Sequence, residues 1–427
     1  MSEWWPQAAK TRKAEVLAAM PHVQEIPDRV EEMVGLTNAI HNTDCINLNP
    51  ATNTMNPRAE NLLSSGIGVR PSLGYPGAKY EMGLAGVEEI EIIAAELACR
   101  VFDAAYAEIR VPSGAMANLF TFMATCSPGD AVIVPPASIG GHVTHNTAGC
   151  AGLYGLEIHE APIDPETYTV DPIGVAKLAE QVQPELITLG QSLNLVPHPI
   201  ADLREIAESV GARLLFDAAH ACAMFAGHQW PNPLTEGAHI MTMSTYESLG
   251  GPPGGLIVTN DADLAERVDT IAYPGMTANF DAAKTAALAV TLTDWLRTGT
   301  DYAAAMALTA HGLAECLTAA NVPVFETVHG YTKSHQFAID ARAFGGGHAT
   351  AVRLEKANIL SSAIGLPSGE DDGLRVGTPE IVRWGMSHTD MPELATYLAQ
   401  ALFSEPTSIA PRITQMRQRF KTLAYVS

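Results

Sequence analysis

Apolar and polar positions repeat with two different periods between residues 88 and 260. Residues 88–102 have apolar side chains at every third or fourth position, which predicts a helix. After this segment, short apolar runs alternate with longer helical stretches. The predicted strands cover residues 105–111, 130–136, 185–190, 213–216, 239–245 and 254–260, and the predicted helices between them cover residues 113–126, 175–183 and 201–210. This alternation is typical of an α/β fold with a mostly parallel sheet and helices on both faces.

The same pattern divides the whole chain into three predicted parts. Residues 1–46 form a helical arm, interrupted at Pro21 and Pro27, that packs on the body or on a partner subunit. Residues 47–280 form the large α/β domain. Residues 281–427 contain a long helix over 281–319 and a smaller α+β domain. A chain of 427 residues is long enough to form two or three such units.

Composition narrows the range of partners. The chain is 47% hydrophobic and 17% charged, which indicates a globular protein with a large interior. Its formal charge is −22, so nucleic acid and anionic membrane surfaces are not expected as partners. The chain has no apolar run near the ~18 residues of a membrane helix. Its six cysteines are scattered, which argues against a zinc site or a disulfide framework and favours the cytoplasm.

Polar residues follow several of the predicted strands, where α/β sheets bind ligands. Ser113-Gly114-Ala115 opens a helix directly after a strand, so its backbone N–H groups can hold a phosphate, although an ordinary helix cap explains the same pattern. His142 follows Gly140-Gly141 near the same edge, and a structural histidine is the alternative. These residues suggest a site without defining its chemistry.

Two further candidate site residues, Asp217 and Arg375, are charged. Asp217 ends the strand at 213–216, and a buried carboxylate there needs a cationic or hydrogen-bonding partner, with His220 three residues later. The alternative is a strand-end aspartate that caps the next turn. Arg375 lies in a short β-like run between Gly373 and Gly377, where a guanidinium can bind a carboxylate with two hydrogen bonds. An arginine on a solvated strand face is the alternative.

Taken together, these segments resemble serine hydroxymethyltransferase, a fold-type I pyridoxal-phosphate enzyme. The resemblance runs in order from about residue 47 to residue 402. The segments that carry it are GYPGAKY (74–80), SGAMANL (113–119), GGHVTH (140–145), FDAAHACAMFAG (216–227) with PNP after it, LGGPPGG (249–255) and GLRVGTPEIVRWG (373–385). The resemblance implies a mostly parallel, seven-stranded sheet flanked by helices, with a smaller α+β C-terminal domain.

The resemblance also implies roles around a pyridoxal phosphate cofactor. Asp217 would pair with the pyridine nitrogen and keep it protonated, which makes the ring an electron sink. His142 would stack on the ring, and His220 would lie near its phenolic oxygen. The residues implied at the phosphate and beside it are Ser113, Gly114, Ala115 and Ser192.

On the substrate side, the resemblance implies that Arg375 clamps the carboxylate of a small amino acid, with Thr52 beside it. Tyr80 would act in the active site of the neighbouring subunit, because the family builds its sites across a dimer interface. The expected partners are therefore an amino-acid substrate and a second copy of the chain.

The decisive departure lies in the loop at residues 244–255. Where the family has His-Lys, this chain has Tyr246-Glu247. The family lysine forms a covalent link to the cofactor, which a glutamate cannot form. Any cofactor at this position is therefore expected to be bound non-covalently.

Other positions depart from the family as well. Pro253 replaces an arginine of the same loop, and Leu73 replaces a glutamate that handles the hydroxymethyl proton. Thr277-Ala278-Asn279 stands where the family has a glycine-rich segment that reaches the partner's phosphate. Folate-dependent interconversion of serine and glycine by the usual mechanism is therefore not expected.

Two hypotheses follow from these departures. In the first, the protein uses non-covalent pyridoxal phosphate, or pyridoxamine phosphate, for an aldol-type or one-carbon or side-chain transfer reaction at the α-carbon of a small amino acid. Glu247 would be the general base, with a pKa raised by apolar walls, and His220 and Tyr80 would assist it. In the second, the protein is a catalytically silent binding or regulatory subunit. The retained Arg375 favours the first hypothesis.

Overall fold

The structure is a computed structural model, and it describes residues 4–427. Its centre is a seven-stranded sheet. In spatial order the strands are β4 (Tyr106–Glu108), β12 (Gly255–Thr259), β11 (Ile240–Ser244), β10 (Arg213–Asp217), β9 (Leu186–Leu189), β5 (Ala131–Val134) and β6 (Glu157–Glu160). β12 runs antiparallel to both of its neighbours, and the remaining pairings are parallel. The predicted α/β class with a mostly parallel sheet is confirmed.

Alternating strand residues build two apolar layers, one on each face of the sheet. In β10, Leu214 and Phe216 pack into one layer and Leu215 packs into the other. Helices α4 (Ala85–Phe102), α7 (Pro172–Val182) and α8 (Ile200–Val210) cover the first face, and α5 (Gly114–Thr125), α6 (Cys150–Tyr154) and α11 (Ala262–Thr270) cover the second. The sheet is therefore buried on both faces, as strands with continuous apolar runs require.

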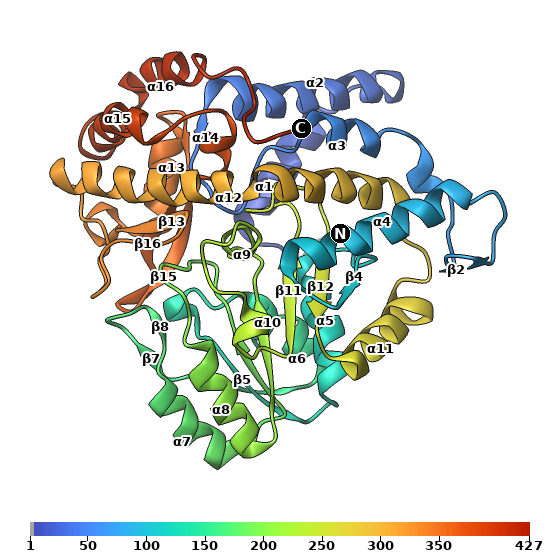
Figure 1. The fold of residues 1–427 in the computed structure, drawn as a ribbon. Helices are drawn as coiled ribbons and strands as arrows, with labels where there is room; N and C mark the ends of the chain where they lie inside the picture. Colours follow the sequence, from blue (N-terminus) through green and yellow to red (C-terminus); the bar gives the residue numbers. More distant parts are fainter. Residues whose placement is uncertain (1–3) are drawn as a thin grey trace.

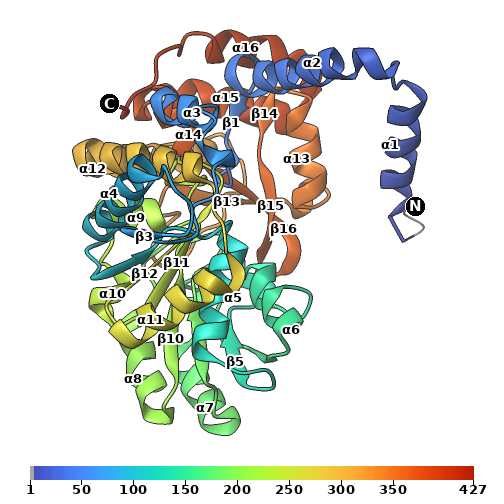
Figure 2. The same ribbon diagram turned by 90° about the vertical axis from the view of Figure 1, so that its right-hand side faces the viewer.

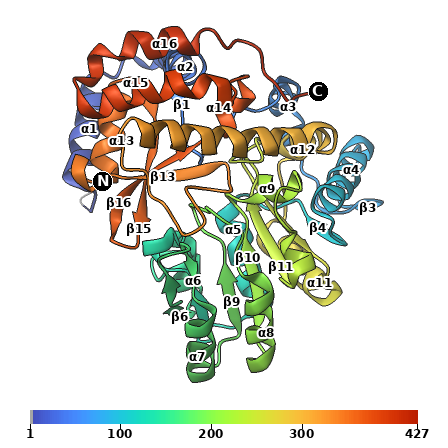
Figure 3. The same ribbon diagram turned by 60° about the vertical axis from the view of Figure 1, so that its left-hand side comes forward.

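Helix α12 (Ala282–Ala319) begins at Asp281, whose side chain caps it, and crosses the molecule between the sheet and the C-terminal helices (Figures 1 and 3). It contacts both neighbouring regions by hydrogen bonds. Trp295 Nε1 donates to the carbonyl of Leu249 at 2.8 Å, and the Tyr302 hydroxyl donates to the carbonyl of Pro379 at 2.7 Å. α12 thus fixes the loop after β11 relative to the C-terminal part.

The C-terminal part contains an antiparallel sheet in the order β13 (Gln336–Asp340), β16 (Gly369–Gly377) and β15 (Ser362–Leu366). Helices α13 (Gly347–Glu355), α14 (Pro379–Arg383), α15 (Met391–Phe403) and α16 (Ala410–Arg417) accompany it. The short strand β1 (Ile46–Asn47) pairs in parallel with β14 (Ile359–Leu360). The segment that begins the predicted large domain therefore contributes a strand to the C-terminal part, while the three domain boundaries stay predictions.

The N-terminal arm consists of α1 (Gln7–Ala18) and α2 (Ile26–Ala39), and α1 stands away from the rest of the chain (Figure 2). Within residues 4–427, neither helix has a buried residue. The predicted arm also includes residues 1–3, which lie outside the described residues. The described helices include none with the length and apolar composition needed to cross a membrane.

Candidate active site

A small cavity of about 130 Å³ lies where the carboxyl ends of the strands meet. Loops after β5, β9, β10 and β11 line it, together with the first turn of α5. The predicted site residues in its lining are Ser113, Gly114, Ala115, His142, Ser192, Asp217, His220 and Glu247. The structure therefore brings together residues from five separate segments at the edge where the sequence analysis expects a ligand.

Asp217 forms a fully bonded wall of this cavity. Its Oδ2 accepts a hydrogen bond from Asn118 Nδ2 at 2.8 Å and lies 2.9 Å from His145 Nε2. Its Oδ1 accepts from the Ala219 N–H at 3.0 Å. Burial by itself would raise the pKa of Asp217. The hydrogen bonds from His145 and Asn118 and the charge of His145 outweigh this effect and lower the pKa to about 2. Asp217 is therefore a fixed anion at neutral pH.

The first turn of α5 borders the cavity beside the end of β11. Ser113 caps the helix, because its Oγ accepts from the Met116 N–H at 3.2 Å. A Cβ atom on Gly114 would lie 2.4 Å from Ser244 Oγ, so a larger residue here would require the Ser244 hydroxyl to move. The helix-cap interpretation of Ser113 is confirmed, and phosphate binding at the same turn stays a prediction.

His142 is held beside this turn by Thr144, whose Oγ1 lies 2.9 Å from His142 Nδ1. Burial lowers the pKa of His142, and the charge of Asp217 only partly opposes this effect. The imidazole is therefore neutral at pH 7, which suits a ring that stacks on a planar aromatic ligand.

Glu247 forms the opposite wall and is 6% exposed. Burial would raise its pKa, but the contact with His220, the charge of Arg375 and a bond with Ser244 outweigh that effect and hold the pKa of Glu247 below its usual value. The expectation of a raised pKa beside apolar walls is therefore wrong. The neighbours of Glu247 come from distant segments of the chain and are polar, so the carboxylate is ionised.

Arg375, on β16, connects this wall to the C-terminal part. Its Nη1 donates to the carbonyl of Ser192 at 2.7 Å and lies 3.2 Å from His220 Nε2. A guanidinium can only donate, so His220 Nε2 accepts, and a neutral His220 carries its proton on Nδ1. Burial lowers the pKa of Arg375 to about 10, with the charge of Glu247 opposing. Arg375 is therefore charged at neutral pH.

Two polar atoms of the Glu247 wall face each other without an aligned hydrogen bond. His220 Nδ1 lies 2.9 Å from Glu247 Oε2, within ion-pair distance. Together with His145 Nδ1, they are among twelve buried side-chain atoms of residues 4–427 that make no aligned hydrogen bond. Buried polar atoms without partners are rare, and a ligand with donors and acceptors would complete them.

Besides Arg375, which contacts the lining residues Ser192 and His220 without lining the cavity itself, two predicted site residues lie apart from the cavity. The Thr52 hydroxyl accepts from Asn47 Nδ2 at 2.7 Å and faces Glu380 Oε2 at 3.4 Å. Its implied place beside the substrate therefore has no support from this geometry. Tyr80 is 81% exposed, and its role requires a second subunit. Both roles stay predictions.

Asn118 and His145, which hold Asp217, were not predicted from the sequence. Asn118 also accepts a hydrogen bond from Thr242 Oγ1 at 2.7 Å, which ties α5 to β11. Both residues lie inside segments that carry the family resemblance, five residues after Ser113 and three after His142. Each residue follows a predicted site residue by a few positions in the same helix or loop. This proximity was the available signal that they belong to the site.

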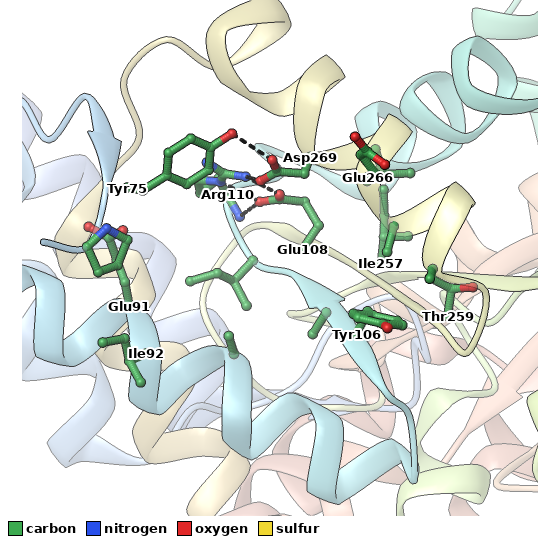
Figure 4. Close-up of a pocket in the computed structure, with 17 residues that line it drawn as sticks. Tyr75, Glu91, Ile92, Tyr106, Glu108, Arg110, Ile257, Thr259, Glu266 and Asp269 are labelled. Carbon is green, nitrogen blue, oxygen red and sulfur yellow. Dashed lines mark hydrogen bonds and ion pairs between the residues drawn. The ribbon is translucent and has the colours of Figure 1, made fainter. Parts of the chain in front are cut away.

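A larger and more apolar groove of about 480 Å³ lies elsewhere, between α4, β4 and α11 (Figure 4). Its charged groups pair with one another. Arg110 contacts both Glu108 and Asp269, and the Tyr75 hydroxyl donates to Asp269 Oδ2 at 2.7 Å. The groove is larger than the cavity, but Arg110, Glu108 and Asp269 in its lining already have partners.

Comparison with known proteins identifies the family of this chain. The family model described as serine hydroxymethyltransferase matches residues 28–398. The chain belongs to the serine hydroxymethyltransferase family. It is 54% identical to an alpha-methylserine aldolase of Variovorax paradoxus, over 99% of this chain and 98% of that protein. It is 55% identical to an alpha-methylserine aldolase of a Ralstonia species over 91% and 90% of the two chains. It is also 34% identical to the serine hydroxymethyltransferase of Sulfolobus acidocaldarius over 94% and 96%.

Membership in the serine hydroxymethyltransferase family confirms the expected fold-type I class and the expected class of pyridoxal-phosphate enzymes acting at the α-carbon of a small amino acid. Relatives named as aldolases agree with the expected departure from standard folate-dependent chemistry. The cavity also fits the family's cofactor. Asp217 is anionic, the Gly114 turn lines the cavity, and His220 Nδ1 and Glu247 Oε2 make no aligned hydrogen bond.

Proposed function

We propose that this protein catalyses the aldol cleavage of an α-methyl, β-hydroxy amino acid of the α-methylserine type, giving alanine and formaldehyde, with pyridoxal phosphate bound non-covalently. The similarity to proteins named alpha-methylserine aldolase over nearly the whole chain supports the reaction class. The ionised Glu247 in the position of the family's lysine is the single observation that carries the non-covalent part.

The chain's residues have separable roles in this proposal. Arg375 binds the carboxylate of the substrate, because it is a buried cation in contact with Ser192 and His220, which line the cavity. Asp217, His142 and the Ser113–Gly114 turn hold the cofactor, which supplies an electron sink for the pair released when the carbon–carbon bond breaks.

Glu247 handles the proton. Cleavage breaks the bond between Cα and the hydroxymethyl carbon, so the hydroxyl proton must leave as formaldehyde forms and a proton must be added at Cα. An ionised carboxylate at this wall can accept the first proton and return one to Cα. His220, which lies 2.9 Å away, orients the carboxylate between these two steps.

The proposal includes a homodimer with shared sites. Lys79 Nζ pairs with Glu91 Oε1 at 2.7 Å in a buried contact, which holds the loop that presents the exposed Tyr80 outward. The arm helices are uncovered in a single chain, and isolated helices of this length are marginal in water. Their half-exposed or more exposed apolar residues include Val16, Leu17, Met20, Val30, Val34 and Leu36. We infer that the arm and the Tyr80 loop both pack on a second copy, in the cytoplasm that the cysteine usage favours.

The test uses purified protein loaded with pyridoxal phosphate. We expect formaldehyde and alanine to form in equal amounts from α-methylserine, and a change of the cofactor's absorbance when alanine is added. Borohydride treatment followed by mass spectrometry should give unmodified protein. A covalent adduct on a lysine would overturn the non-covalent part. Activity with pyridoxamine phosphate alone would reassign the cofactor, and absence of product with either form would favour a silent binding subunit.

A further inference from the structure

A chain of hydrogen bonds runs from Arg375 away from the cavity and into the C-terminal part. Arg375 donates from Nε and Nη2 to Ser362 Oγ, each at 3.1 Å. Ser362 Oγ donates to Asn49 Oδ1 at 3.1 Å. The Asn49 N–H donates to Asn47 Oδ1 at 3.0 Å, and Asn47 Nδ2 donates to Glu380 Oε2 at 2.7 Å. The guanidinium is thereby connected to one buried carboxyl group.

The direction of these bonds follows from donor counting. The Ser362 hydroxyl has a single proton, and Arg375 can only donate, so Ser362 must turn its lone pairs toward Arg375 and its proton toward Asn49. Asn49 presents its oxygen correctly because Asn47 holds its backbone. Asn47 in turn is held by Glu380. Each link therefore fixes the orientation of the next one.

Glu380, on α14, is buried on every side. Asn47 and Thr52 face it from the N-terminal segment, and Arg417 is the charged group that faces it from α16, with Trp384 adjacent on its own segment. Burial raises the pKa of Glu380 to about 7, while the bond from Asn47 and the charge of Arg417 oppose the increase. The carboxyl therefore changes its charge close to neutral pH.

We propose that Glu380 is a positioning residue for Arg375, which it orients for the substrate carboxylate through Asn47, Asn49 and Ser362. The inference rests on the proposed function in one respect, namely that Arg375 binds an amino-acid carboxylate. It assigns to Glu380 no contact with substrate or cofactor. It also explains why Thr52, implied beside the substrate, faces Glu380 in the structure: it is a second hydrogen-bonding neighbour of that carboxyl.

The proposal has a consequence for pH. An ionised Glu380 accepts a stronger, charge-assisted bond from Asn47 than a neutral one does. The chain of bonds is therefore firmest above pH 7, and the affinity for a carboxylate ligand should fall as the pH is lowered through 7.

The test measures binding of 2-aminoisobutyrate, an amino acid with no hydroxymethyl group to cleave, to the cofactor-loaded protein by calorimetry. We expect Ser362→Ala and Glu380→Ala each to raise Kd by about ten-fold, as loss of a bond that supports a charged group does. The double variant should also raise Kd by about ten-fold, because both changes interrupt one chain. Independent effects that multiply to about 100-fold would overturn the proposal.

Glu380→Gln separates orientation from charge and guards against a misfolded alanine variant. Glutamine keeps an acceptor for Asn47 but carries no charge, so its Kd should match that of the unaltered protein at pH 6, and the fall in affinity between pH 8 and pH 6 should disappear. Glu393→Gln, on α15, serves as a control that keeps the pH effect. The proposal would be overturned if Glu380→Gln kept the pH dependence of Kd. It would also be overturned if Glu380→Ala left Kd for 2-aminoisobutyrate unchanged.

Three outcomes distinguish failure of the role of Glu380 from failure of the proposed function. If α-methylserine is not cleaved but 2-aminoisobutyrate binds with the coupling described, only the proposed function is wrong. If cleavage occurs and the two variants act independently, only the role of Glu380 is wrong. If the unaltered loaded protein binds no amino acid, both are wrong.

Discussion

The apolar groove beside Arg110 and the polar cavity at the strand ends differ in a way that locates the chemistry. The groove holds about 480 Å³ and the cavity about 130 Å³, so size favours the groove. In the groove, however, Arg110, Glu108 and Asp269 pair with one another. In the cavity, His220 Nδ1 and Glu247 Oε2 are buried 2.9 Å apart, but neither atom makes an aligned hydrogen bond. Incomplete polar bonding, more than volume, marks a place prepared for a ligand.

The largest expected effect on turnover comes from Asp217, which accepts hydrogen bonds at both carboxylate oxygens. Asp217→Asn keeps the shape of the side chain and removes its charge. We expect turnover of α-methylserine to fall by about 10³-fold, the upper range for loss of one preorganised electrostatic partner. Steady-state assays with saturating cofactor measure this. Asp261→Asn, which changes an aspartate that caps α11 far from the cavity, is the matched control. A loss of less than about ten-fold would contradict the role of the anion.

The next largest effect on turnover is expected from Glu247, on the opposite wall of the cavity. Glu247→Gln removes the carboxylate that accepts the proton, so kcat should fall by about 10²-fold with Kd for 2-aminoisobutyrate little changed. Glu247→Lys should convert the cofactor link to a covalent one, visible by mass spectrometry after borohydride treatment. Glu236→Gln is the control for the chemical change. Unaltered kcat in Glu247→Gln would remove Glu247 from the reaction.

A smaller effect concerns stability at low pH. The pKa of Asp217 is depressed from 3.8 to about 2 in the folded chain, so its contribution is present above pH 4 and is lost as the pH falls toward 2. The shift corresponds to about 2 kcal/mol. Glu380 has the opposite sign, since its raised pKa makes its contribution complete below pH 4.5 and lost as the pH rises to 7. Urea unfolding of Glu380→Gln should therefore show a gain of about 3 kcal/mol at pH 8 and none at pH 4.5. Equal stability changes at both pH values would contradict the pKa shift.

The smallest effect is expected in the groove. Tyr106→Ser removes a large apolar side chain that lines it and is 43% exposed. If the cavity alone carries the reaction, turnover and amino-acid affinity should both stay within two-fold, which the assays above can resolve. A strong loss of turnover with an unaltered oligomeric state would show that the groove takes part.

The sequence predicted the sheet well where apolar runs were continuous, as in β5, β9, β10 and β11. It missed β6, because this edge strand alternates Glu157, Ile158, His159 and Glu160 and leaves its side chains partly exposed. An edge strand with polar residues has little apolar signal to read. The positions at the strand ends were predicted because strand ends in α/β sheets meet at one edge.

The electrostatic state of the site was harder to predict. The raised pKa expected for Glu247 failed because His220 and Arg375, which lower it, come from other strands and are not neighbours in sequence. The chain of bonds through Asn49 and Asn47 was also hidden, since it joins residues near position 50 to residues near position 380. Spacing along a chain reports periodicity, but it does not report which distant side chains will share a buried space.

Helix α12 has a consequence for the rigidity of the site. Trp295 holds the backbone of the Glu247 loop and Tyr302 holds the segment that follows β16, and the two residues are about 10 Å apart along one helix axis. The loop that carries Glu247 and the segment that follows Arg375 are thus anchored to the same helix. The relative position of these two segments is therefore set before any ligand arrives, and binding does not have to assemble the wall that they form.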